Sequence, residues 1–185
     1  MQDITISWRF WLFWVLAFLS FPIAGLLANL VGSVTTPVRG LLAGAIAGVA
    51  LGLIQWLILK TRFPQLPIWW IVATGAGMGI GLAISTAVLG SETAGSDLLW
   101  RGVITGFCIG AAQWIVFRQF VPLPQSVIWV GVVGIAWALG WFVTRSAGID
   151  LSPRWAVYGI SGALTFQLVT GLALYFLLRT AQAAK

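Results

Sequence analysis

The side chains best suited to hold a ligand in this sequence are three glutamines and two tryptophans inside long apolar segments. They are Gln55, Gln113, Gln167, Trp137 and Trp141. Carboxamides can hold a polar group of a ligand, and the two tryptophans, one helical turn apart, could stack on a lipid or a flat cofactor. Packing between helices is the simpler interpretation for all five, because amides and aromatic rings also join helices in lipid.

Gln167 stands out because it interrupts a stripe of small residues. Gly48 and Gly106 hold the corresponding positions of two related segments. An amide deep in a bilayer costs several kcal/mol unless it is hydrogen-bonded. Gln167 could therefore hold a ligand, a water molecule or a pigment. A hydrogen bond to a carbonyl of a neighbouring helix, typically worth about 0.6 kcal/mol, is the alternative that we favour.

Catalytic chemistry is not predicted by the remaining residues. The chain has no histidine and a single cysteine, Cys108. Histidine is the commonest metal ligand and the usual acid–base group near neutral pH. The serines of the apolar segments, Ser20, Ser85 and Ser161, have no identifiable base partner. We expect neither an enzyme nor a metal site, and the sequence names no cofactor.

The elements that position these residues are apolar helices in a membrane. Of the 185 residues, 60% are hydrophobic and only 8% are charged, whereas soluble domains carry about 25% charged residues. The formal net charge is +6, but the basic residues stand singly at the ends of apolar runs, where membrane anchors belong. Nucleic-acid binding is therefore rejected, and residues 1–185 are expected to form a single transmembrane domain.

Six segments are long enough to cross a bilayer, which takes about 20 apolar residues. They are residues 8–31, 37–60, 68–89, 97–119, 127–144 and 154–179. Because lipid cannot satisfy backbone polar groups, segments of this length must be helices. The predicted fold class is an all-α integral membrane protein.

Several residues predict where these helices begin, end and bend. Capping hydroxyls precede three of them, at Thr36, Ser96 and Ser152. Pro122 and Pro124 are expected to lie in a linker, and Pro22 is expected to kink the first helix.

The distribution of basic residues predicts the orientation. One side collects Arg9, Lys60, Arg62, Arg118, Arg179 and Lys185, and the other collects Arg39, Arg101, Arg145 and Arg154. Six against four places both termini in the cytoplasm. Arg101, Arg145 and Arg154 are expected to be solvated anchors at the membrane surface.

An internal repeat of two helices runs through the sequence. Gly-Leu-Ile-Gln-Trp-Leu-Ile-Leu-Lys (52–60) returns as Gly-Ala-Ala-Gln-Trp-Ile-Val-Phe-Arg (110–118), and a weaker copy lies at 171–179. Trp11, Trp70 and Trp129 follow one another at intervals of 59 residues (70 − 11 and 129 − 70). We expect three tandem units, residues 8–60, 68–119 and 127–179, which are parallel and related by a pseudo-threefold axis. The alternative is two good copies flanked by two unrelated helices.

The repeated glycine–x–x–Gln–Trp segment, with its upstream glycines and a downstream helix that begins with tryptophan, resembles a loose group of uncharacterised bacterial multi-pass membrane proteins. The resemblance covers the second to fifth helices well, the sixth poorly and the first hardly at all. It implies a bacterial, repeat-built membrane protein and carries no activity.

Three functions are compatible with these features. The first is a non-catalytic accessory, scaffold or assembly subunit of a complex in a bacterial plasma membrane or a photosynthetic (thylakoid) membrane. Its partners would be membrane lipids and either other membrane-protein subunits or further copies of the chain. The second is a binder or carrier of a lipid, quinone, carotenoid or chlorophyll. A small transporter or channel ranks last, because no acid or base lies deep in a span.

Overall fold

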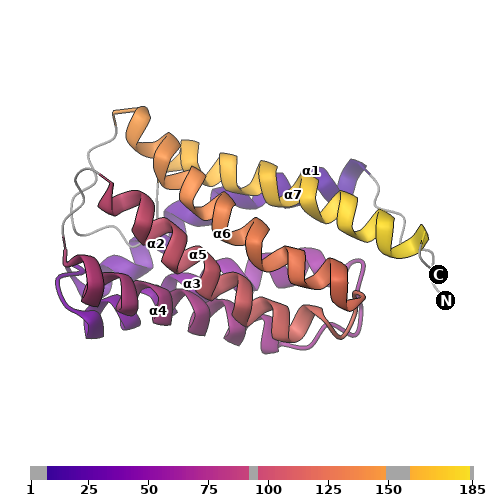
Figure 1. The fold of residues 1–185 in the computed structure, drawn as a ribbon, viewed down its shortest axis with the longest axis horizontal. Coiled ribbons are helices and arrows are strands. Elements are labelled where there is room, and N and C mark those ends of the chain that lie inside the picture. Colours follow the sequence, from indigo (N-terminus) through magenta and orange to yellow (C-terminus); the bar gives the residue numbers. More distant parts are fainter. Residues whose placement is uncertain (1–7, 92–95, 149–158, 184–185) are drawn as a thin grey trace.

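Helices make up the computed structural model, which describes residues 8–91, 96–148 and 159–183 (Figure 1). The elements in order are α1 (Trp8–Leu16), η1 (Ala17–Leu19), α2 (Ser20–Ala28), η2 (Asn29–Val31), α3 (Pro37–Lys60), α4 (Trp69–Leu89), α5 (Asp97–Phe117), α6 (Leu123–Ser146) and α7 (Ile160–Ala183). The first four run on as one helical segment, here called the first span. Together with α3–α7 it gives six helices that are long and apolar enough to cross a membrane. For the described residues, the predicted all-helical class is therefore confirmed, as are six helices of sufficient length and hydropathy to cross a membrane.

The first span is irregular where the sequence predicts a bend. Pro22 has no N–H to donate to the carbonyl of Phe18, four residues earlier. The turn just before it, Ala17–Leu19, is accordingly a 3₁₀ helix between α1 and α2. This irregularity separates α1 from α2, the part of the first span that mainly contacts α3.

The helix ends agree with the sequence in part. The Thr36 hydroxyl accepts the backbone N–H of Arg39 at 3.3 Å and caps α3 as predicted, but the Ser96 side chain makes no capping hydrogen bond to α5. The expected linker at Pro122 and Pro124 is wrong in part: α6 begins at Leu123, because proline in a first turn has no hydrogen bond to lose. Ser152 lies outside the described residues.

The six spans form a ring in chain order. Each span packs against the next, and α7 packs against α1 and so closes the ring. The start of α1 and the end of α7 consequently lie at the same end of the bundle (Figure 1).

Glycines bring consecutive helices into backbone contact. A Cβ atom placed on Gly44 of α3 would lie 2.6 Å from the carbonyl oxygen of Met78 in α4. One placed on Gly106 of α5 would lie 2.9 Å from the Cα of Gly134 in α6. Such distances leave no room for a methyl group. The neighbouring helix thus covers these glycines.

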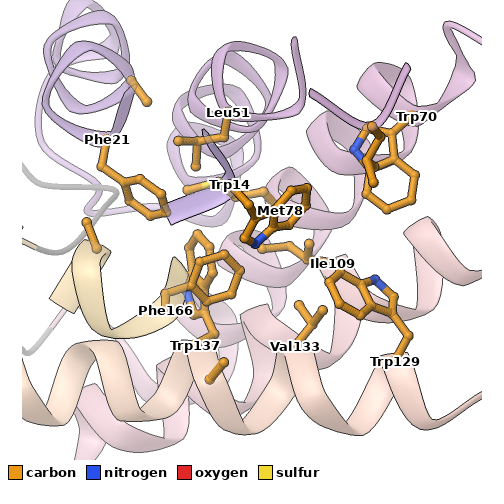
Figure 2. Close-up of a cluster of buried hydrophobic side chains, with 14 of the residues drawn as sticks. Trp14, Phe21, Leu51, Trp70, Met78, Ile109, Trp129, Val133, Trp137 and Phe166 are labelled. Carbon is orange, nitrogen blue, oxygen red and sulfur yellow. The ribbon is translucent and has the colours of Figure 1, made fainter. Parts of the chain in front are cut away.

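Aromatic side chains fill the interior of the ring. Trp14 and Trp129 meet edge to face with ring centroids 6.4 Å apart, and Phe117 lies 5.6 Å from Trp129 and 6.1 Å from Trp70. Figure 2 shows these tryptophans together with aliphatic side chains from several helices, Met78 among them. Trp14 is the fully buried tryptophan of the first span, whereas Trp11, which has the 59-residue spacing to Trp70, is partly exposed.

The backbone contact between α3 and α4 predicts a contrast between two glycine substitutions. Gly44→Ala would overpack the contact with Met78 and lower the free energy of unfolding by about 1–3 kcal/mol. Gly131→Ala is the matched control, because no atom lies within 4 Å of a Cβ placed on Gly131, and it should be neutral or stabilising by up to about 1 kcal/mol. Unfolding in detergent followed by tryptophan fluorescence measures both. Equal stabilities for the two variants would contradict the close contact.

Candidate functional site

A buried hydrogen-bond network centred on Gln113 joins four helices. Its side-chain amide, Nε2, donates to Gln55 Oε1 on α3 and to Thr74 Oγ1 on α4, both at 3.0 Å. Its carbonyl oxygen, Oε1, accepts the indole N–H of Trp129 on α6 at 3.0 Å. Both N–H bonds of this amide are therefore used inside the bundle, as buried polar groups require.

Thr74 completes the network on α4. Its hydroxyl donates to the backbone carbonyl of Trp70 at 2.8 Å and at the same time accepts from Gln113. The network is not symmetric, because the indole N–H of Trp70 has no hydrogen-bond partner among the described residues, whereas that of Trp129 does.

The two repeated glutamines meet because they lie at the same level of the ring and both side chains point into its interior. Gln55 and Gln113 are 58 residues apart and hold the same position in the repeated segment. Both point into the ring, with exposed fractions of 3% and 1%. The sequence places each of them next to a tryptophan in the repeated segment, and it does not predict their mutual contact. The signal that could have predicted this contact is a pair of amides that point inward at the same level of a narrow ring.

Gln167 is fully buried and its environment differs from that of the other glutamines. Neither its Oε1 nor its Nε2 has a hydrogen-bond partner among the described residues, so the favoured bond to a neighbouring carbonyl is not formed there. In the next turn of α7, the hydroxyl of Thr170 does have hydrogen-bond partners. It accepts the indole N–H of Trp14 at 3.0 Å and donates to the carbonyl of Phe166 at 2.7 Å.

Trp137 and Trp141 both lie in the core, each with an exposed fraction of 2%. Trp137 packs edge to face on Phe166 at 5.1 Å and lies 6.1 Å from Phe21 (Figure 2). Trp141 packs against α5, where its Cδ1 would lie 2.8 Å from a Cβ placed on Gly102. Trp137 therefore packs against aromatic side chains of the protein, and Trp141 packs closely against the backbone of α5.

Arg101 corrects an expectation from the sequence. The sequence predicts a solvated anchor, yet only 5% of the residue is exposed. Its guanidinium donates to the Gly90 carbonyl at 2.7 Å and to Thr86 Oγ1 at 3.2 Å, which satisfies the end of α4. Arg145 is exposed as expected, and Arg154 lies outside the described residues.

Aromatic and basic side chains are paired near the opposite end of the bundle. The Lys60 ammonium lies 4.6 Å from the ring centroid of Trp56, and the Arg118 guanidinium lies 5.1 Å from that of Trp114. On α7 the Arg179 guanidinium donates to the Tyr175 hydroxyl at 3.2 Å. Cation–π pairs of this kind anchor helix ends at an interface.

An apolar groove of about 770 Å³ opens on the outside of the ring between the first span and α3. Its lining includes Leu16, Ser20 and Ile23 on one side and Ile46, Ala50 and Leu53 on the other. The sequence does not predict this groove, because nothing in the pattern of a single helix tells how closely it approaches its neighbour.

The chemical capacity of these features is binding rather than proton transfer. Carboxamides and hydroxyls do not titrate near neutral pH, and the described residues include no group of acids, cysteines or histidines that could hold a metal ion. The polar groups of the amide network bind one another, whereas Gln167 and the outer groove remain available for contact with a further molecule.

The two kinds of buried glutamine predict opposite effects of the same substitution. Gln113→Leu leaves the Trp129 indole N–H buried without an acceptor and should lower the free energy of unfolding by about 1–3 kcal/mol. Gln167→Leu removes an amide that lacks protein partners and should raise it by about 1 kcal/mol. Denaturation in detergent micelles measures both. A loss of stability in Gln167→Leu would instead show that this amide contacts something outside the described chain.

Comparison of the chain with protein-family models, with curated proteins and with solved structures finds no match.

Proposed function

We propose that the chain is a membrane-embedded scaffold or accessory subunit that crosses the bilayer six times and acts through its outer surface. The observation that carries the proposal is the packed interior. Trp129 contacts both Trp14 and Phe117 in the centre of the ring, where a transporter or channel would need a polar path. The outer surface is the part left to interact, and large exposed apolar side chains occur on all six spans.

Three equivalent packing contacts support a pseudo-threefold design of this scaffold. Gly52 of α3 packs on Thr74 of α4, and Gly110 of α5 packs on Val130 of α6. Gly171 of α7 packs on the first span, where Trp14 would lie 3.0 Å from a Cβ placed on this glycine. Each even-numbered span of the ring thus packs on the following odd-numbered one, and the last packs on the first. We propose that the units 8–60, 68–119 and 127–179 arose as copies of one hairpin, with an axis along the membrane normal.

The proposed location is a bacterial plasma membrane or a thylakoid membrane, with both termini in the cytoplasm. The paired basic residues Lys60, Arg118 and Arg179 support this orientation, because they lie at the end of the bundle where α1 begins. Basic residues are enriched on the cytoplasmic side of membrane proteins.

A binder or carrier of a hydrophobic small molecule is the second candidate. The groove between the first span and α3 favours it, since its volume of about 770 Å³ falls within the range of small-molecule sites, about 300–1,000 Å³.

Labelling of introduced cysteines tests the six crossings. In a Cys108→Ala background, single cysteines replace Thr35, Ser146, Thr61 or Gln119, all exposed and outside the apolar cores of the spans. A membrane-impermeant maleimide should label positions 35 and 146 in intact cells, and positions 61 and 119 only after the membrane is opened. Labelling of all four alike would contradict the crossings, and the reverse pattern would contradict the orientation.

Native purification tests the scaffold role. After chemical crosslinking in intact membranes and extraction in mild detergent, the chain should be recovered in a complex with other membrane subunits or with further copies of itself. Recovery of only the single chain, with crosslinking efficiency verified on a known complex of the same membrane, would contradict the proposal.

A further inference from the structure

The seam between the first span and α3 is looser than the other two seams within the proposed hairpins. In the seam between α4 and α5, Cβ atoms placed on Gly77 and Gly81 would lie 2.7 Å from the Cα of Ile109 and 2.6 Å from that of Thr105. In the seam between α6 and α7, Gly162 meets the Gly140 carbonyl just as closely. Glycines therefore bring these two pairs of helices into backbone contact.

Longer side chains face one another between the first span and α3. Leu16 and Ile23 on one helix and Ile46 and Leu53 on the other line the groove, and they hold the two backbones apart. Ser20 adds a hydroxyl, but that hydroxyl donates to the carbonyl of Ala17 at 2.6 Å. The groove therefore presents almost entirely hydrocarbon to its occupant.

The groove opens toward the end of the bundle where α1 begins and α3 ends. The first span contacts α3 mainly through α2 rather than through α1, so the two helices diverge toward that end. Two exposed basic residues continue the lining faces there. Arg9 lies seven residues before Leu16, and Lys60 lies seven residues after Leu53, a spacing of two turns that keeps each on the face of its helix that lines the groove.

We propose that this groove binds one anionic phospholipid, with an acyl chain between the first span and α3 and the phosphate between Arg9 and Lys60. The proposal rests on the membrane insertion proposed above. Seven residues of helix rise by about 10 Å, and one leaflet of hydrocarbon is about 15 Å deep. An acyl chain whose phosphate lies at Arg9 and Lys60 therefore reaches the groove from the same leaflet. Two cations at the open end favour this lipid over an uncharged apolar molecule or the helix of a partner.

Native mass spectrometry of the detergent-purified full chain tests the proposal with two added lipids, phosphatidylglycerol and phosphatidylcholine. The wild type should retain one phosphatidylglycerol and prefer it over phosphatidylcholine. Arg9→Gln/Lys60→Gln should weaken phosphatidylglycerol retention by about 30-fold, or about fivefold for each basic residue. Ala50→Phe, which places a ring in the groove, should reduce retention of both lipids.

Matched controls separate this site from general attraction to the membrane surface. Arg118→Gln/Arg179→Gln removes the same charge at the same end of the bundle, away from the groove, and Ala111→Phe adds the same ring to an exposed position of α5. Both should retain lipid like the wild type. Three results would overturn the proposal: the wild type retains the two lipids equally, the two charge variants lose lipid equally, or Ala50→Phe retains as much lipid as the wild type. The proposal would also be overturned if a polypeptide were retained in place of lipid and were displaced by Ala50→Phe. The cysteine labelling above fails separately if the chain is not inserted, so the two failures are distinguishable.

Discussion

Close backbone contact between helices is the constraint on which this architecture depends. Lipid tails are as apolar as leucine, so burying hydrocarbon gives membrane helices little reason to associate, and van der Waals contact must supply the attraction. Gly44 and Gly48 let α3 approach within contact of the α4 backbone, and the same holds for Gly106 and α6. Where such glycines face a neighbour the helices close up, and where branched side chains face it, as along α3 and the first span, a groove remains.

The interior follows from the same constraint. Helices held close together around a ring leave a narrow space, which large rings fill and in which polar groups must find partners from the protein itself. The amide of Gln113 does so with three helices besides its own, α3, α4 and α6. Gln167 does not find such partners among the described residues, although it is equally buried. That difference between chemically identical side chains makes Gln167 the more informative position for function.

The sequence predicts the six helices and misses much of how they meet. Apolar length and capping at Thr36 place the spans to within a few residues, because those signals are local. The burial of Arg101 is missed, since its partners, Gly90 and Thr86, lie 11 and 15 residues earlier in the chain, on and just after the preceding helix. The interval of 59 residues from Trp11 to Trp70 likewise does not predict that Trp14 is the fully buried tryptophan of the first span. The five candidate residues are all buried as their apolar surroundings imply, and Gln55 and Gln113 are joined by a hydrogen bond that the sequence does not predict.

The closure of α7 on α1 has a consequence for biosynthesis. In the proposed membrane location, ribosomes deliver the first span well before the last, at about 5–20 residues per second. Until α7 arrives, the indole N–H of Trp14 lacks its acceptor on Thr170, and the side of α1 that will receive Gly171 faces lipid or another protein. A nascent chain therefore carries an unsatisfied donor for roughly 10–30 seconds, and a chain truncated before α7 carries it permanently. Such a donor inside the bilayer is a physical mark by which membrane chaperones and proteases can tell an unfinished ring from a closed one.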